Sequence, residues 1–96
     1  MNKELIYQKI RNYFQDKPVR KVAVFGSYAR SSQKRNSDID ILITMLAPVG
    51  LLTLSGYQIE LEKLLGIRVD LGTEQGVSPI VKPFIEKDLE IVYEKK

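Results

Sequence analysis

Two short apolar segments, separated by a polar stretch, constrain the fold of this chain most strongly. The first covers residues 22–25, and the second covers residues 38–45 but carries Asp38 and Asp40 among its apolar side chains. Runs of this length, rich in Val, Ile and Phe, predict buried strands. Because side chains two positions apart in a strand point to the same face, Asp38 and Asp40 are expected to project together. The sequence therefore predicts a strand that presents a pair of carboxylates.

A small-residue turn follows the first predicted strand, at Gly26 and Ser27. Backbone N–H groups in such a turn can be exposed to bind an anion. The nearby carboxylates would repel each other unless a cation lay between them, and hard divalent cations take oxygen ligands. The chain has no His and no Cys, so any metal must be bound by oxygen, which favours Mg²⁺ or Mn²⁺. These parts are what a protein needs to hold a metal–nucleotide complex.

Two motifs and a third acid resemble the minimal nucleotidyltransferase family, which lies within the DNA polymerase β-like superfamily. The motifs are GSYAR at residues 26–30 and SDID at residues 37–40. The third acid is Asp70, in a strand-like stretch that matches the position of the family's last carboxylate. One departure is Ser31, because a Gly often follows the Arg in this family. The resemblance covers nearly the whole chain.

This resemblance implies roles for six residues. Three carboxylates are expected to be catalytic and to hold metal, with two Mg²⁺ ions favoured and Mn²⁺ as the other option: Asp38, Asp40 and Asp70. The turn and the arginine after it are expected to bind the nucleoside triphosphate: Gly26, Ser27 and Arg30. The implied reaction is in-line attack on the α-phosphate, with pyrophosphate as the leaving group.

The residues by themselves leave other interpretations open. Asp38 and Asp40 could lie at an exposed strand end and pair with Arg30 or Arg35. Without the acids beside it, the Gly-Ser pair would be an ordinary tight turn. Arg30 could bind the triphosphate or simply form an ion pair with Asp38.

The chain as a whole predicts a single α/β domain over residues 1–96. Helical and strand-like patterns alternate along it. The expected helices and strands, in order, cover residues 3–15, 20–25, 26–32, 38–45, 51–65, 67–72, a helix opened by Ser78 and Pro79, and 89–93. The short link between the first two strands permits antiparallel pairing. We therefore expect a mixed sheet of roughly four strands packed against helices.

Composition limits the remaining function classes. With 96 residues and a net charge of +3, the chain gives no strong nucleic-acid signal. The absence of His and Cys excludes disulfides and Ser-His-Asp or Cys-His catalysis. The longest mostly apolar stretch, residues 41–54, is too short to span a bilayer, and no signal peptide is apparent. A cytoplasmic protein without a membrane partner is the default expectation.

The family resemblance also implies a biological setting. Minimal nucleotidyltransferases are commonly paired with a small helical protein of the HEPN class, which suggests a toxin–antitoxin module. The chain would be the antitoxin and would transfer AMP from ATP to a hydroxyl of its partner. The alternative is a binding module that neutralises the partner by contact, with a vestigial nucleotide site. Homo-oligomerisation also remains an option.

Overall fold

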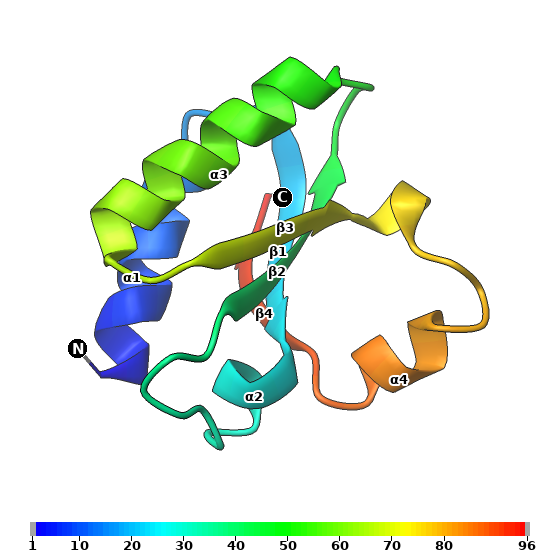
Figure 1. The fold of residues 1–96 in the computed structure, drawn as a ribbon. Helices are drawn as coiled ribbons and strands as arrows, with labels where there is room; N and C mark the ends of the chain where they lie inside the picture. The colour runs from blue at the N-terminus through cyan, green and yellow to red at the C-terminus, as the bar shows by residue number, and fades with distance from the viewer. Residues whose placement is uncertain (1, 96) are drawn as a thin grey trace.

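A four-stranded mixed sheet forms the centre of the protein. The computed structural model describes residues 2–95. The strands are β1 (Val19–Phe25), β2 (Ile39–Met45), β3 (Val69–Thr73) and β4 (Glu90–Glu94). They lie in the order β3-β2-β1-β4, with β1 antiparallel to both of its neighbours and β2 parallel to β3 (Figure 1). The predicted mixed sheet of four strands is confirmed.

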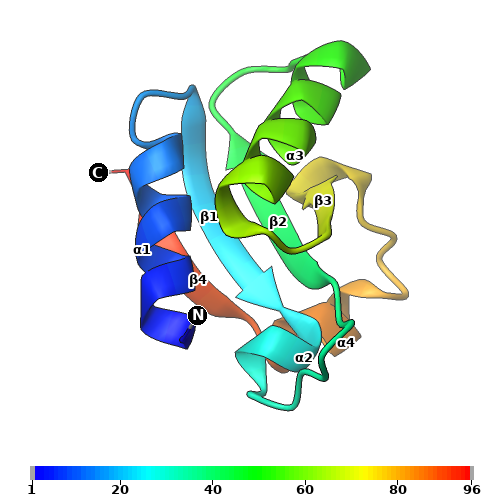
Figure 2. The same cartoon turned by 60° about the vertical axis from the view of Figure 1, so that its left-hand side comes forward.

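Two long helices cover one face of this sheet. They are α1 (Lys3–Phe14) and α3 (Leu51–Leu65), and Figure 2 shows both lying on the same side of the strands. The Asn2 side chain caps the start of α1 by accepting a hydrogen bond from the Leu5 N–H at 2.8 Å. At the end of α3, Gly66 closes the helix as expected, and its N–H donates to the Glu62 carbonyl.

The core lies between these helices and the sheet. Its largest fully buried side chains include Phe14, Ile10, Ile41, Ile43 and Leu61. Along β2, the odd-numbered isoleucines are fully buried, while the even-numbered residues lie on the other face and are partly exposed. Asp40 is one of these even-numbered residues, so burial of the isoleucines directs its carboxylate away from the core.

Short helical segments complete the fold. α2 (Gly26–Ala29) follows β1 directly, a 3₁₀ turn covers Glu74–Gly76, and α4 (Lys82–Glu86) lies on the side of the sheet opposite α1 and α3 (Figure 1). Among the described residues, no helix is both long enough and apolar enough to cross a bilayer.

The predicted start of the last helix was wrong. Ser78 precedes a turn at residues 79–81, which includes Pro79 and in which the Ser78 carbonyl accepts hydrogen bonds from the N–H groups of Val81 and Lys82 at 3.0 Å each. The helix begins three residues later than predicted, at Lys82. Its apolar residues also lack a common buried face, since the Phe84 side chain is 76% exposed. Local start signals were therefore not reinforced by packing.

Candidate active site

Asp40 and Asp70 lie side by side on the open face of the sheet. The parallel register of β2 and β3 pairs these two residues directly. Burial, the negative charges of Asp70 and Asp38, and a hydrogen bond with Asp70 raise the pKa of Asp40 to about 6, against an ordinary value of 3.8. The positive charge of Arg30 opposes this shift. Two of the three predicted acids thus meet, at a cost in electrostatic repulsion.

Gly26 lies against the Asp40 carboxylate. A Cβ atom at Gly26 would overlap Asp40 Oδ2, and the residue has φ +74°, which side chains rarely allow. The register of β1 and β2 explains the contact, since Phe25 pairs with Asp40 and Gly26 follows it. We expected the missing side chain to admit a phosphate; in the structure it admits the carboxylate.

Ser27 lies in α2, the short helix that follows β1, and Arg30 comes directly after that helix. The Ser27 carbonyl accepts a hydrogen bond from the Ser32 N–H at 2.8 Å, which folds the chain back after α2. Arg30 Nη1 contacts Asp88 Oδ2 at 3.1 Å, in the segment that connects α4 to β4. Arg30 therefore pairs with an acid that sequence reasoning had not considered, and not with Asp38.

Asp38 lies just before β2 and forms a different ion pair. Its Oδ1 atom is 3.0 Å from Nε of Arg68, and both side chains are largely exposed. The backbone joins the same two segments, because the Ile39 N–H donates to the Arg68 carbonyl at 2.9 Å. Neither Arg30 nor Arg35, the partners considered from the sequence, makes this pair. No sequence signal identified Arg68, which is 30 positions away.

The donor atoms fit a hard cation in part. Asp40 and Asp70 offer adjacent carboxylate oxygens whose mutual repulsion a divalent cation would relieve. Among residues 2–95, however, no three acidic side chains are close enough together to form a metal-binding group. The Oδ1 atom of Asp38 pairs with Arg68 instead of facing the other two acids. A metal site formed by all three acids therefore stays a prediction.

Comparisons with known proteins identify relatives along most of the chain. The model of the family described as "Nucleotidyltransferase domain" matches residues 7–92. A protein named "Putative protein adenylyltransferase MJ1217", from Methanocaldococcus jannaschii, is 51% identical over 72 residues, which is 74% of each chain.

Solved structures share the fold. A "putative minimal nucleotidyltransferase" superposes with a TM-score of 0.80 at 28% identity, covering 94% of this chain and 95% of the other. A tri-AMPylated HEPN toxin in complex with an MNT antitoxin, from Shewanella oneidensis, contains a chain with a TM-score of 0.79 at 19% identity. That match covers 98% of this chain and 74% of the other.

Proposed function

The chain belongs to the nucleotidyltransferase domain family, and from this premise we propose that it transfers AMP from ATP to a hydroxyl group of a partner protein. The family membership makes it a nucleotidyltransferase. Support for a protein as acceptor comes from its 51% identity to a relative named as a protein adenylyltransferase. Support for AMP comes from the tri-AMPylated toxin in a complex whose antitoxin fold resembles this one.

The contact between Asp40, Asp70 and Gly26 is the observation that carries this proposal. The Asp40 carboxylate, which lies beside Asp70 in the parallel register, is packed against a turn where a side chain would both strain the backbone and meet that carboxylate. Burial and the neighbouring negative charges raise the pKa of Asp40, and such a shift is typical of carboxylates in a site that binds a cation. An ordinary exposed strand end would not produce either feature.

The six residues then take the following roles. Asp38, Asp40 and Asp70 would hold Mg²⁺, which when bound offsets phosphate charge and stabilises the attacking and leaving oxygens. The N–H groups of Gly26 and Ser27 would bind the phosphates, and Arg30 would exchange Asp88 for the triphosphate.

The proposed reaction is a nucleotidyl transfer. The acceptor oxygen bonds to the α-phosphorus of ATP while the bond from that phosphorus to the bridging oxygen breaks, so that pyrophosphate leaves. The hydroxyl proton passes to a carboxylate, for which Asp70 is the proposed acceptor. Holding the reactants in line supplies much of the rate enhancement, so the site needs no covalent nucleophile.

A HEPN-class protein is the proposed partner, and the pair would work as toxin and antitoxin in the cytoplasm. The antitoxin in the Shewanella oneidensis complex has the same fold at low identity, which supports this assignment. A partner of this kind would provide the acceptor hydroxyl.

Transfer of label from ATP tests the proposal. The chain is incubated with α-labelled ATP, Mg²⁺ and a HEPN-class protein from the same genome. Asp40→Asn and Asp70→Asn should each lower the transfer rate by about 100-fold or more. Asp16→Asn is the matched control, because the exposed Asp16 side chain forms its ion pair with the neighbouring Lys17 and should leave the rate unchanged.

Two outcomes would contradict the proposal. One is transfer that persists in both site variants. The other is a wild-type chain that transfers no label yet neutralises the partner as well as Asp40→Asn does, which would identify a binding module.

A further inference from the structure

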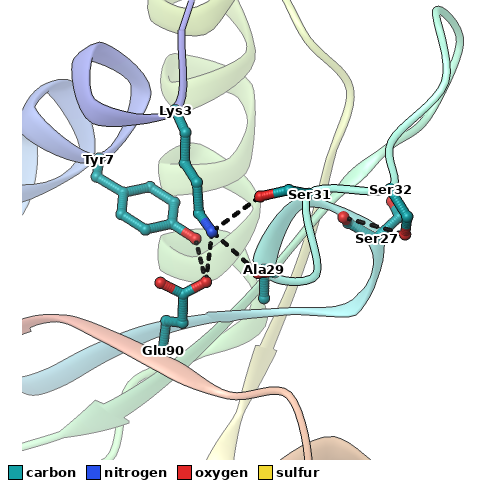
Figure 3. Close-up of polar contacts among 7 residues, drawn as sticks. All are labelled: Lys3, Tyr7, Ser27, Ala29, Ser31, Ser32 and Glu90. Atoms are coloured by element: carbon teal, nitrogen blue, oxygen red, sulfur yellow. Dashed lines mark hydrogen bonds and ion pairs between the residues drawn. The ribbon is translucent and has the colours of Figure 1, made fainter.

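We propose that Lys3 is a positioning residue for α2, and through α2 for the phosphate-binding turn of the proposed transferase. The contacts of the Lys3 ammonium do not include the three proposed metal-binding acids, Asp38, Asp40 and Asp70. It lies on α1, and its side chain reaches the end of α2 that is remote from Gly26 (Figure 3). The inference rests on the proposed function for its effect on nucleotide, but not for its effect on α2.

Three hydrogen bonds saturate the Lys3 ammonium group. Nζ donates to the Ala29 carbonyl at 2.9 Å, to Ser31 Oγ at 3.3 Å and to Glu90 Oε1 at 2.6 Å. An ammonium group has three donors, so none is left for another partner. Figure 3 shows the three acceptors converging on Nζ from α2, from the turn after it and from β4. One side chain of α1 therefore connects two regions that are distant from it in the sequence, residues 29–31 and β4.

α2 needs such a brace because it is only four residues long. The last carbonyls of a helix lack partners within the helix, and a cation there is favourable. Lys3 supplies that cation at Ala29. The chain then turns at Ser31 with φ +58°, a conformation that costs energy for any residue with a side chain. Backbone hydrogen bonds from Ser31 N–H to the Tyr28 carbonyl and from Ser32 N–H to the Ser27 carbonyl close this turn, and the Lys3 contact to Ser31 Oγ adds a side-chain connection to α1.

Glu90 and Tyr7 hold Lys3 in place. Glu90 Oε1 accepts from Lys3 and also from the Tyr7 hydroxyl at 3.4 Å. Burial, together with the charge of Glu90, raises the pKa of Tyr7, so its hydroxyl keeps the proton that it donates. The Lys3 ammonium therefore cannot swing away without breaking a partly buried ion pair.

Movement of α2 would reach the candidate active site directly. Gly26, its first residue, lies against the Asp40 carboxylate, and Arg30 follows its last residue. A shift of the Ala29 end would change where the N–H groups of Gly26 and Ser27 and the Arg30 guanidinium lie relative to the acids. Lys3 thus sets the geometry of the turn without touching nucleotide.

The test compares Lys3→Met with Lys9→Met. Lys9 lies on the same helix and makes no ion pair with the residues that the structure describes, so it controls for loss of one positive charge on α1. Hydrogen exchange of the amides in residues 26–32 measures α2 directly. Calorimetry with AMP-PNP and Mg²⁺ measures nucleotide affinity, and steady-state transfer separates KM from kcat.

We expect Lys3→Met to speed exchange at residues 26–32 by about tenfold and to raise the Kd for AMP-PNP by about tenfold. The KM for ATP should rise in parallel, with a smaller change in kcat. Lys9→Met should match the wild type. Lys3→Arg, which keeps a cation and several donors, should recover most of the affinity.

Two results would overturn the inference. In the first, exchange at residues 26–32 is unchanged in Lys3→Met. In the second, exchange rises equally across the sheet and the Kd is unchanged, which would mean that Lys3 only adds general stability. If the wild type binds no AMP-PNP, the proposed function fails, but the exchange measurement still decides whether Lys3 holds α2.

Discussion

At the scale of single residues, Gly26 meets two demands at once. Its φ of +74° disfavours any side chain, and the Asp40 carboxylate occupies the place of a Cβ. We predict that Gly26→Ala lowers the free energy of unfolding by about 2 kcal/mol and lowers transfer by about 100-fold, because Asp40 must move. Urea denaturation and the transfer assay measure the two effects.

Gly56→Ala is the control for that substitution. Gly56 lies inside α3, and no packing neighbour lies within 4 Å of the place that an alanine Cβ would take. Alanine there should therefore raise the free energy of unfolding by about 0.5–1 kcal/mol. Equal effects of the two substitutions would contradict the argument from the Asp40 contact.

Asp40 predicts a pH dependence of stability. The folded chain holds the Asp40 proton more tightly than the unfolded chain does, with a pKa of about 6 against 3.8. This group therefore favours the folded state below pH 3.8 and loses that contribution as the pH rises through about 6. Asp40→Asn removes the ionisation, so it should stabilise the protein at pH 8 by about 1 kcal/mol, allowing for the partial exposure of the side chain.

The measurement is urea denaturation of both proteins in EDTA, at about pH 8 and about pH 3. The gain from Asp40→Asn should largely disappear at the lower pH, where the carboxyl is mostly neutral in both states. A gain that is independent of pH would show that Asp40 is not the group responsible.

Ser31 is the residue at which the chain departs from the family pattern. The departure leaves the turn conformation intact, since Ser31 adopts φ +58°, the region that glycine prefers. Ser31→Gly should therefore raise the free energy of unfolding by about 0.5–1 kcal/mol, despite losing the 3.3 Å contact from Lys3. Ser32→Gly, one position on and without a positive φ, should lower it by a few tenths to about 1 kcal/mol. Urea denaturation would distinguish the two, and a loss at Ser31 would contradict the strain argument.

At the scale of elements, periodicity predicted most of the fold. α1 and β2 begin and end within a residue of their expected bounds, because each has a buried face that matches its repeat. α3 matches its expected bounds at both ends. α4 was predicted least well, because turn residues gave its start signal and its apolar side chains remain exposed. Periodicity is informative only where an element packs against something.

β4 tests the same rule, since its neighbouring residues face opposite ways. The Val92 side chain is 5% exposed and belongs to the core, whereas Ile91 is 54% exposed. Val92→Ala should lower the free energy of unfolding by about 2 kcal/mol, and Ile91→Ala by about 0.5 kcal/mol or less. Urea denaturation measures both. Similar losses at the two positions would mean that β4 does not present alternate faces to the core and to solvent.

At the scale of the whole molecule, the proximity of Gly26, Asp40 and Asp70 agrees with the sequence analysis, while the roles of the six site residues stay predictions. Spacing along β2 predicted the direction of Asp40, the motif at residues 26–30 indicated Gly26, and the family resemblance of a later strand-like stretch indicated Asp70. Spacing could not give the ion pairs of Asp38 with Arg68 and of Arg30 with Asp88, which join segments 30 and 58 positions apart. Such pairs depend on how the elements pack, which no local pattern encodes.

The sheet order predicts how the protein unfolds. β1 lies inside the sheet and pairs with both β2 and β4. Neither edge strand, β3 or β4, can therefore leave the sheet without exposing the common core. Far-UV circular dichroism and tyrosine fluorescence should therefore give the same urea midpoint. Fluorescence reports on all five tyrosines, including Tyr13 and Tyr57, which pack with Phe14 between α1 and α3. Separate midpoints would show that the helices leave the sheet before it unfolds.

The contact between Lys3 and Glu90 joins residues that are 87 positions apart. A ribosome completes residues 3–70, with the glycine–serine turn and all three acids, before it translates the codon for Glu90. An incomplete nascent chain would therefore contain every residue proposed to touch nucleotide while α2 still lacked its brace. A product that terminates before β4 would therefore lack the Glu90 contact that we propose to hold Lys3, and should bind nucleotide more weakly than the complete chain.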